Sequence, residues 1–239
     1  MKQKKVKYVD LFAGLGGIRI GFVQAFEEAG FQTECVLTSE IKPSAVKALT
    51  TNFGAKTIQG DITTIDSTEI PDFDFLLAGF PCQAFSVAGK QRGFLDTRGT
   101  LFFEVERILR EKKPYGFILE NVEGLVTHDK EKPEDDIGRT LATILQSLDT
   151  MGYKVTWKVL DAQNFGLAQC RNRIYIVGTK KEKLSLDNFP VTTATFDSVM
   201  EHGLDTIDNE FSRKLFGKYE VNDLYGKSIK DKRGGDNNI

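Results

Sequence analysis

The chain has 239 residues, 40% of them apolar and 10% aromatic, which is enough to bury the core of one large α/β domain. No apolar run approaches the roughly 18 to 20 residues that span a bilayer, and residues 1–5 enter a strand pattern without an apolar signal core, so we expect a cytoplasmic protein with no membrane partner. The net charge of −2 lacks the basic excess of many nucleic-acid binders. Three cysteines without a CxxC pair, beside two histidines, predict neither a disulfide framework nor a metal site.

Short apolar runs alternate with helical patterns from residue 6 to about residue 125, which predicts βαβ units and a mainly parallel sheet. We expect strands at residues 6–12, 35–39, 56–60, 73–78 and 117–119. Helices are expected after a glycine turn at residues 14–17, at residues 43–53, from residue 101 up to Pro114, and at residues 141–151.

The pattern changes in the last part of the chain. Val155, Trp157 and Val159 alternate with polar residues, and residues 173–178 form another apolar run. We therefore expect an antiparallel pair at the sheet edge. Beyond residue 178 the periodicity is too weak to predict a strand or a helix.

Ligands of open parallel sheets bind beyond the carboxyl ends of the strands, so the residues that follow each apolar run are informative. The glycine turn follows the first strand, Glu40 the second and Asp61 the third. Glycines let a ligand approach the backbone amides closely, and an acid after the second strand can accept hydrogen bonds from ribose hydroxyls. Together they predict a nucleoside-cofactor site. A Rossmann dehydrogenase is the competing interpretation, but its G-x-G-x-x-G spacing fits poorly because no third glycine follows until Gly21.

Cys82 and Glu120 follow the fourth and fifth predicted strands. A lone cysteine is more often an inert buried side chain than a nucleophile, but a strand end in a polar, glycine-rich segment favours a thiolate. Glu120 borders an apolar run, where partial desolvation would raise its pKa and let it hold a proton; the alternative is an ordinary strand-end acid. Cys35 and Cys170 lack this combination, and we interpret both as bystanders.

Basic residues are clustered locally. Arg171 and Arg173 are two apart at the start of an apolar run, so both guanidinium groups are placed to face one target. Lys90, Arg92 and Arg98 share one glycine-containing segment, and a second cluster lies at residues 227–233. These clusters predict phosphate contacts, with solvated loops as the alternative.

Four ordered motifs resemble the signature motifs of the cytosine-C5 DNA methyltransferases, bacterial restriction-modification type. They are Asp10-Leu11-Phe12-Ala13-Gly14-Leu15-Gly16-Gly17, Gly79-Phe80-Pro81-Cys82-Gln83, Glu120-Asn121-Val122 and Gln169-Cys170-Arg171-Asn172-Arg173. The resemblance covers roughly three quarters of the chain and implies a Rossmann-like α/β methyltransferase fold.

The resemblance implies that Cys82 attacks C6 of a cytosine flipped out of duplex DNA while Glu120 holds N3 of the ring. Carbon C5 then attacks the methyl group of S-adenosylmethionine (AdoMet), and proton loss from C5 and elimination of the thiolate restore the base. Arg171 and Arg173 would hold the flipped nucleotide. Residues 86–98 look like the family's loop that closes over DNA, with contacts from Ser86, Lys90, Arg92 and Arg98.

By the same resemblance, eight residues would surround AdoMet, with Asp61 near the adenine amino group. They are Phe12, Gly14, Gly16, Glu40, Ile41, Asp61, Ile62 and Pro81. No metal is expected in this chemistry.

Two departures from the family stand out. Ala168 occupies a position that is usually proline, and the chain lacks most of a target-recognition region and the two motifs that follow it in the family. We interpret residues 1–178 as the AdoMet-binding catalytic domain and residues 179–239 as a linker with the start of a recognition region. A second polypeptide would then supply the missing parts; a truncated fragment is the alternative.

Two further functions stay open on the sequence. A tRNA cytosine-C5 methyltransferase of the same fold would use Cys82 and Glu120 unchanged. A non-catalytic subunit of a methyltransferase complex would keep the fold without turnover, although the presence of both residues counts against it.

Overall fold

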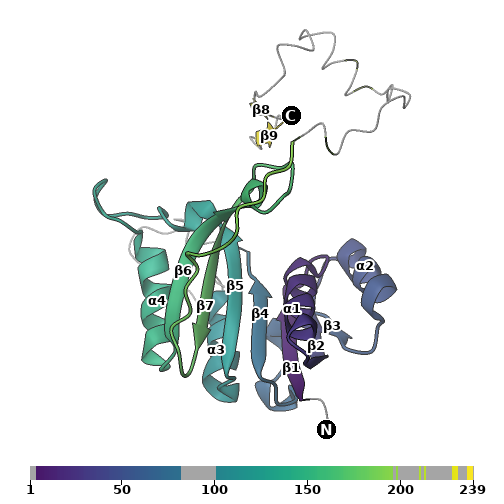
Figure 1. Cartoon of the computed structure of the whole chain (residues 1–239). Helices are drawn as coiled ribbons and strands as arrows, with labels where there is room; N and C mark the ends of the chain where they lie inside the picture. Colours follow the sequence, from purple (N-terminus) through teal and green to yellow (C-terminus); the bar gives the residue numbers. More distant parts are fainter. Residues whose placement is uncertain are drawn as a thin grey trace. The chain divides into compact units, whose positions relative to one another are not determined.

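The computed structural model describes residues 4–81, 101–195, 198, 210, 213, 228–230 and 236–238 (Figure 1). The chain divides into two compact units. The first comprises Met1–Leu160 and Asn172–Phe189, and the second Asp161–Arg171 and Pro190–Ile239. The assignment of residues 179–239 to a recognition region stays a prediction.

The first unit is built on a seven-stranded sheet with the order β3-β2-β1-β4-β5-β7-β6. Neighbours among β1 to β5 pair in parallel, and β7 pairs antiparallel with β5, which confirms the mainly parallel sheet with an antiparallel edge. The strands are β1 (Lys5–Leu11), β2 (Gln32–Ser39), β3 (Ile58–Gln59), β4 (Phe75–Gly79), β5 (Gly116–Val122), β6 (Lys154–Asp161) and β7 (Asn172–Thr179).

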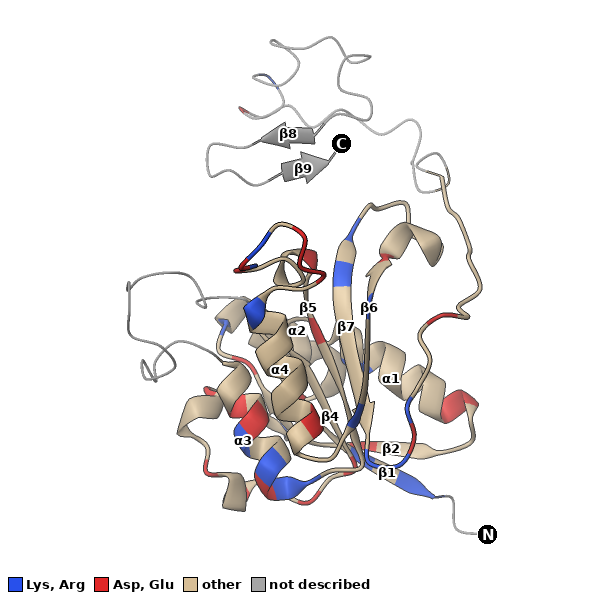
Figure 2. Ribbon diagram, turned by 90° about the vertical axis from the view of Figure 1, so that its left-hand side faces the viewer, with Lys and Arg blue, Asp and Glu red and all other residues tan. Residues whose placement is uncertain are grey.

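Helices cover both faces of this sheet, with α3 and α4 on one side and α1 on the other (Figure 2). Buried residues of α3 and α4 share a core cluster with Val9, Leu11 and Leu76, whereas Phe22 of α1 packs with Tyr8 and Leu77. The helices are α1 (Gly17–Glu28), α2 (Pro43–Phe53), α3 (Phe102–Lys112) and α4 (Arg139–Thr150). Among the described residues, no helix has the length and apolarity needed to cross a membrane.

Strand ends differ most from the prediction. The third strand was expected at residues 56–60 but has only two residues, Ile58–Gln59. The fifth strand, β5, continues past Leu119 through Val122. Glu120 and Asn121 therefore lie inside β5 rather than after it, because the partner strand β7 pairs with all of residues 116–122. A short antiparallel ribbon, β8 (Ser228–Lys230) with β9 (Asp236–Asn238), appears where no strand was predicted.

Candidate active site

The turn between β1 and α1 has an unusual backbone. Phe12, Gly14 and Gly16 have φ values of 54°, 55° and 84°, in the left-handed region. This region disfavours a bulky residue such as Phe12 by about 1 to 2 kcal/mol. Gly16 is also confined by packing, since a Cβ there would lie 2.7 Å from Cε2 of Phe53. The turn is therefore a constrained loop, consistent with close approach of a ligand.

Glu40 ties the glycine turn to the end of β2. Its Oε2 accepts a hydrogen bond of 2.8 Å from the Gly14 amide, and its Oε1 accepts one of 2.7 Å from the Lys42 amide. The Ala13 amide donates to the Ser39 carbonyl at 3.1 Å, which joins the same two segments. Because a carboxylate has about four lone-pair sites, Glu40 retains acceptor capacity for ribose hydroxyls.

Asp61 caps the short helix η1 (Ile62–Thr64) after β3. Its Oδ1 accepts 2.9 Å hydrogen bonds from the amide and the hydroxyl of Thr63. Ile62 is 1% exposed and belongs to the core, so in this conformation it offers a ligand its backbone rather than its side chain. Arg107 of α3 braces this segment by donating to the carbonyls of Ile62 (3.3 Å) and Ile65 (3.1 Å).

Gly79, the last residue of β4, lies where the glycine turn meets Glu120. A Cβ at this position would lie 3.4 Å from Oε2 of Glu120, 3.7 Å from Cδ1 of Ile18 and 3.8 Å from the carbonyl oxygen of Phe12. The fold thus brings the predicted cofactor turn and the predicted acid together, although 108 residues separate Phe12 from Glu120.

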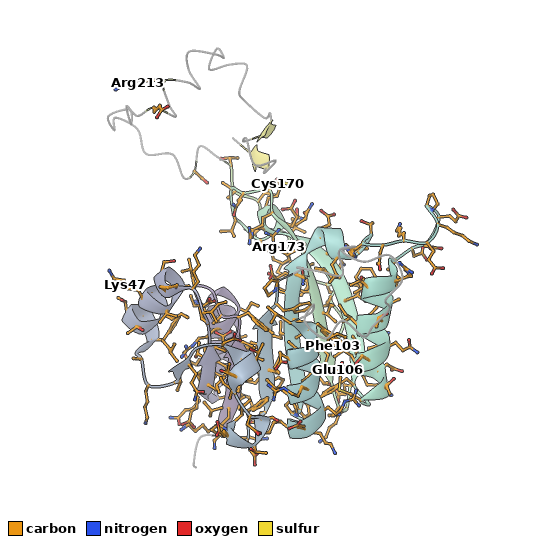
Figure 3. The ribbon with its side chains drawn as sticks, turned by 180° about the vertical axis from the view of Figure 1, so that it is seen from behind. Lys47, Phe103, Glu106, Cys170, Arg173 and Arg213 are labelled. Atoms are coloured by element: carbon orange, nitrogen blue, oxygen red, sulfur yellow. The ribbon has the colours of Figure 1, made fainter. Side chains whose placement is uncertain are left out.

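Glu120 forms an ion pair with Arg173 across β5 and β7. The Nε of Arg173 lies 3.1 Å from Oε1 of Glu120, and the two side chains are 22% and 21% exposed. Figure 3 shows Arg173 near one end of the sheet, where it pairs in register with Val122, two residues beyond Glu120. An arginine fixes the orientation of a carboxylate and leaves its second oxygen for a substrate.

Asn121 anchors the segment that leads to Cys82. It is 3% exposed, and its Nδ2 donates a 2.9 Å hydrogen bond to the Phe80 carbonyl. Its Oδ1 accepts from the Val122 amide at 2.8 Å. The end of β5 therefore sets the path of the chain up to Pro81, which is exposed.

Five predicted site residues lie outside the described residues: Cys82, Ser86, Lys90, Arg92 and Arg98. Arg171 belongs to the second unit, where its amide donates to Oδ1 of Asp161 at 3.0 Å. Arg171 also precedes β7, which begins at Asn172, so the prediction that both arginines point the same way from one strand stays untested.

The two bystander cysteines differ in environment. Burial raises the pKa of the Cys35 thiol, whose Sγ lies 3.2 Å from the Thr38 hydroxyl. A raised pKa disfavours the thiolate, which agrees with an inert side chain. Cys170 is exposed, and its Sγ lies 3.8 Å from Oδ2 of Asp161.

The site has room and suitable groups for a nucleoside cofactor. No atom of the described residues lies within 4 Å of a Cβ placed at Gly14 or Gly17. Leu15 and Ile41, next to the turn and to Glu40, are 66% and 69% exposed, which leaves apolar surface that a purine or thioether would cover. Among the described residues, no group of three or more His, Cys, Asp or Glu side chains could hold a metal ion.

Sequence reasoning missed three residues that support this site: Asp10, Arg19 and Arg107. Asp10 and Arg19 are buried, with 2% and 9% exposure. A charged residue inside an apolar strand, and another on the apolar face of the next helix, were signals that could have identified the first two. No local signal marks the contacts of Arg107 with the Ile62 and Ile65 carbonyls, which lie more than 40 positions away in the sequence.

This strand order, with a glycine turn after β1, an acid after β2 and an acid on β5, defines the class of AdoMet-dependent methyltransferases. The family model of the C-5 cytosine-specific DNA methylases matches residues 6–234. The chain belongs to this family.

Similar proteins and structures agree with this membership. The chain is 54% identical over 236 residues to the Type II methyltransferase M.NlaIV of Neisseria lactamica, covering 99% of this chain and 56% of that protein. It is 46% identical over 257 residues to M.BanI of Aneurinibacillus aneurinilyticus, covering 97% and 57%. The chain therefore spans a little over half the length of these curated relatives.

Solved structures show the same fold. The S. pombe Dnmt2 methyltransferase superposes with a TM-score of 0.66 at 20% identity, covering 89% of this chain and 67% of that one. The Entamoeba histolytica methyltransferase EhMeth gives 0.64 at 18% identity, covering 85% and 62%.

Proposed function

We propose that this chain carries the AdoMet site and the catalytic residues of a DNA (cytosine-5-)-methyltransferase of a restriction-modification system. The observation that carries the proposal is the Glu120–Arg173 pair beside the glycine turn, in a chain that retains Cys82 in its family motif. The names of the relatives, Type II methyltransferases, support the same activity.

In this mechanism the Cys82 thiolate adds to C6 of a flipped cytosine, and Glu120 holds the proton at N3 that offsets the charge developing on the ring. Arg173 keeps the Glu120 carboxyl oriented. AdoMet supplies the methyl group that C5 accepts. Loss of the C5 proton then allows the Cys82 sulfur to leave, so the thiolate is regenerated and 5-methylcytosine is the product.

We assign the cofactor to the carboxyl edge of β1, β2 and β3. Glu40 would accept hydrogen bonds from the ribose hydroxyls. Oδ2 of Asp61 would accept a hydrogen bond from the adenine amino group, since the contacts with Thr63 use Oδ1. The backbone of Phe12, Gly14, Gly16 and Ile62, with the side chain of Ile41, would line the rest. No metal is required.

Duplex DNA is the proposed substrate, contacted by Arg171 and by Ser86, Lys90, Arg92 and Arg98. A second polypeptide that carries a recognition region remains our predicted partner. Transfer of tritiated methyl groups to duplex DNA by this chain, with and without proteins encoded beside it, tests that prediction. Full sequence-specific activity of the chain alone would contradict it.

The proposed reaction is tested by Cys82→Ser in the active assembly. We expect methyl transfer to DNA to fall on the order of a thousandfold or more, as for loss of other enzyme nucleophiles. A covalent adduct with 5-fluorocytosine DNA should form with the unaltered chain and not with the variant. Cys35→Ser is the control, because a hydroxyl can replace the thiol beside Thr38.

Undiminished turnover of Cys82→Ser would contradict the mechanism. Methylation of tRNA in a parallel incubation, with none of duplex DNA, would instead establish the RNA substrate.

A further inference from the structure

A buried acid in the strand before the glycine turn and a buried arginine in the helix after it have incomplete hydrogen bonding. Asp10, near the end of β1, is 2% exposed, and Arg19, in the first turn of α1, is 9% exposed. Among the described residues, Oδ2 of Asp10 and Nη1 of Arg19 have no hydrogen-bond partner. Buried polar atoms are normally satisfied, so this pair calls for a physical reason.

Arg19 connects this buried pair to the glycine turn. Its guanidinium lies over the Phe53 ring, with 4.1 Å between Cζ and the ring centroid. The same ring confines Gly16, where a Cβ would lie 2.7 Å from Cε2 of Phe53. Arg19 is therefore linked to the turn through Phe53, and its positive charge also acts on the Asp10 carboxyl.

Asp10 also lies in an electrostatic environment that includes the site. Burial raises the pKa of its carboxyl to about 7, Arg19 lowers it, and the negative charge of Glu40 raises it. Tyr8 of β1 and Cys35 of β2 face the same group, and burial raises the pKa of both. The charge on Asp10 is thus coupled to that of Glu40, the acid that accepts a hydrogen bond from the Gly14 amide.

We propose that Asp10 is a specificity-determining residue whose negative charge, partly balanced by Arg19, favours the cationic donor AdoMet over its demethylated product. The inference rests on the proposed function, because it requires AdoMet to bind at the glycine turn. AdoMet carries a sulfonium charge that S-adenosylhomocysteine lacks. A carboxylate in a medium of low polarity attracts that additional charge more strongly than a neutral carboxylic acid does.

The direction of the pH effect follows from linkage. A bound cation stabilises ionised Asp10, so the complex releases a proton that the unliganded chain holds. AdoMet affinity should therefore rise as the pH increases from 6 to 8. Each unit by which the bound cation lowers the pKa of Asp10 gives up to about a tenfold gain. The product should show a smaller rise.

Calorimetric titration of the full chain with AdoMet and with S-adenosylhomocysteine at pH 6, 7 and 8 tests the proposal. In Asp10→Asn we expect the ratio of the two affinities to become independent of pH, and proton release on AdoMet binding at pH 7 to fall. The amino group of the ligand titrates in both proteins, so the difference between the unaltered chain and Asp10→Asn removes its contribution. Asp72→Asn is the matched control, because Asp72 is 99% exposed and is paired with Lys112.

Arg19→Met provides a second measurement that a purely structural role would not affect. Removing the positive charge should shift the midpoint of the pH dependence upward, because Arg19 lowers the pKa of Asp10. Equal pH dependence of the affinity ratio in the unaltered chain and in Asp10→Asn would overturn the inference and leave the proposed function intact. Failure of the unaltered chain to bind either ligand would overturn the cofactor assignment and the inference with it.

Discussion

At the residue scale, the described part of the chain gives Glu120 one ion-pair partner, Arg173. Arg173 reaches it from the adjacent antiparallel strand, and Gly79 leaves the space that its other oxygen faces. A carboxyl group held in this way is suited to steady a ring nitrogen, because its geometry is set before the substrate arrives. Arginine fits this task better than lysine, since its planar group orients a carboxylate.

Glu120→Gln should lower the rate of methyl transfer by about a hundredfold or more, the usual contribution of a positioned acid. AdoMet affinity should change little, because within the described residues no hydrogen bond joins Glu120 to the glycine turn. Single-turnover measurements with separate cofactor titrations check both expectations. Glu123→Gln, an exposed acid three residues further on, serves as control; an equal loss there would argue against a specific role.

At the element scale, the proposed cofactor site depends on how the ends of β1, β2 and β3 are joined to the helices around them. Phe53 of α2 closes over Gly16, and Arg107 of α3 braces the segment after β3. Two helices therefore support the same edge of the sheet, and changes in either should alter cofactor binding.

Gly16→Ala tests the contact with α2. The added methyl group meets Phe53 in a left-handed conformation (φ 84°), so we expect a loss of about 1 to 3 kcal/mol in unfolding free energy and weaker AdoMet binding. Gly21→Ala, with open space around its Cβ in α1, should instead stabilise by up to about 1 kcal/mol. Urea unfolding of both variants measures the difference; equal effects would contradict the packing argument.

Arg107→Ala tests the contact from α3. Loss of two hydrogen bonds to the Ile62 and Ile65 carbonyls should cost about 1 to 3 kcal/mol and weaken binding of adenosine as well as AdoMet, because Asp61 lies in the same segment. In Arg110→Ala the broken pair with Glu106 has an exposed arginine (57%, against 20% for Glu106), so the cost should stay below about 1 kcal/mol. Denaturation and adenosine titration distinguish the two variants.

At the scale of the whole molecule, stability and function are expected to conflict at Asp10. Its pKa is raised to about 7 by burial, whereas in the unfolded chain it lies near 3.8. The folded chain therefore holds more protons than the unfolded chain between these values, and this group lowers stability as the pH rises through that window.

Asp10→Asn removes this titration. The difference in unfolding free energy between the variant and the unaltered chain should shift in favour of the variant, by up to a few kcal/mol, from pH 4 to pH 8. Chemical denaturation at several pH values measures it. A difference that does not change with pH would show that Asp10 titrates normally. If Asp10→Asn is more stable at pH 8 and prefers AdoMet over S-adenosylhomocysteine less strongly, Asp10 serves binding at the expense of stability.

Much of the site could be predicted from the sequence alone, for a physical reason. Turn chemistry and hydrophobic periodicity are local properties, so the glycine turn, the acid after the second strand and the parallel sheet follow from neighbouring residues. The helix at residues 43–53 was predicted where the structure has it, because Pro43 is favoured in the first turn of a helix.

Only the tertiary structure decided which of these residues meet. The pairing of Glu120 with Arg173, of Asn121 with Phe80 and of Arg19 with Phe53 joins residues 34 to 53 positions apart. Such contacts depend on strand order and helix packing, which no local pattern encodes. For the same reason the fifth strand extends through Val122, since its length is set by its partner strand rather than by its own residues.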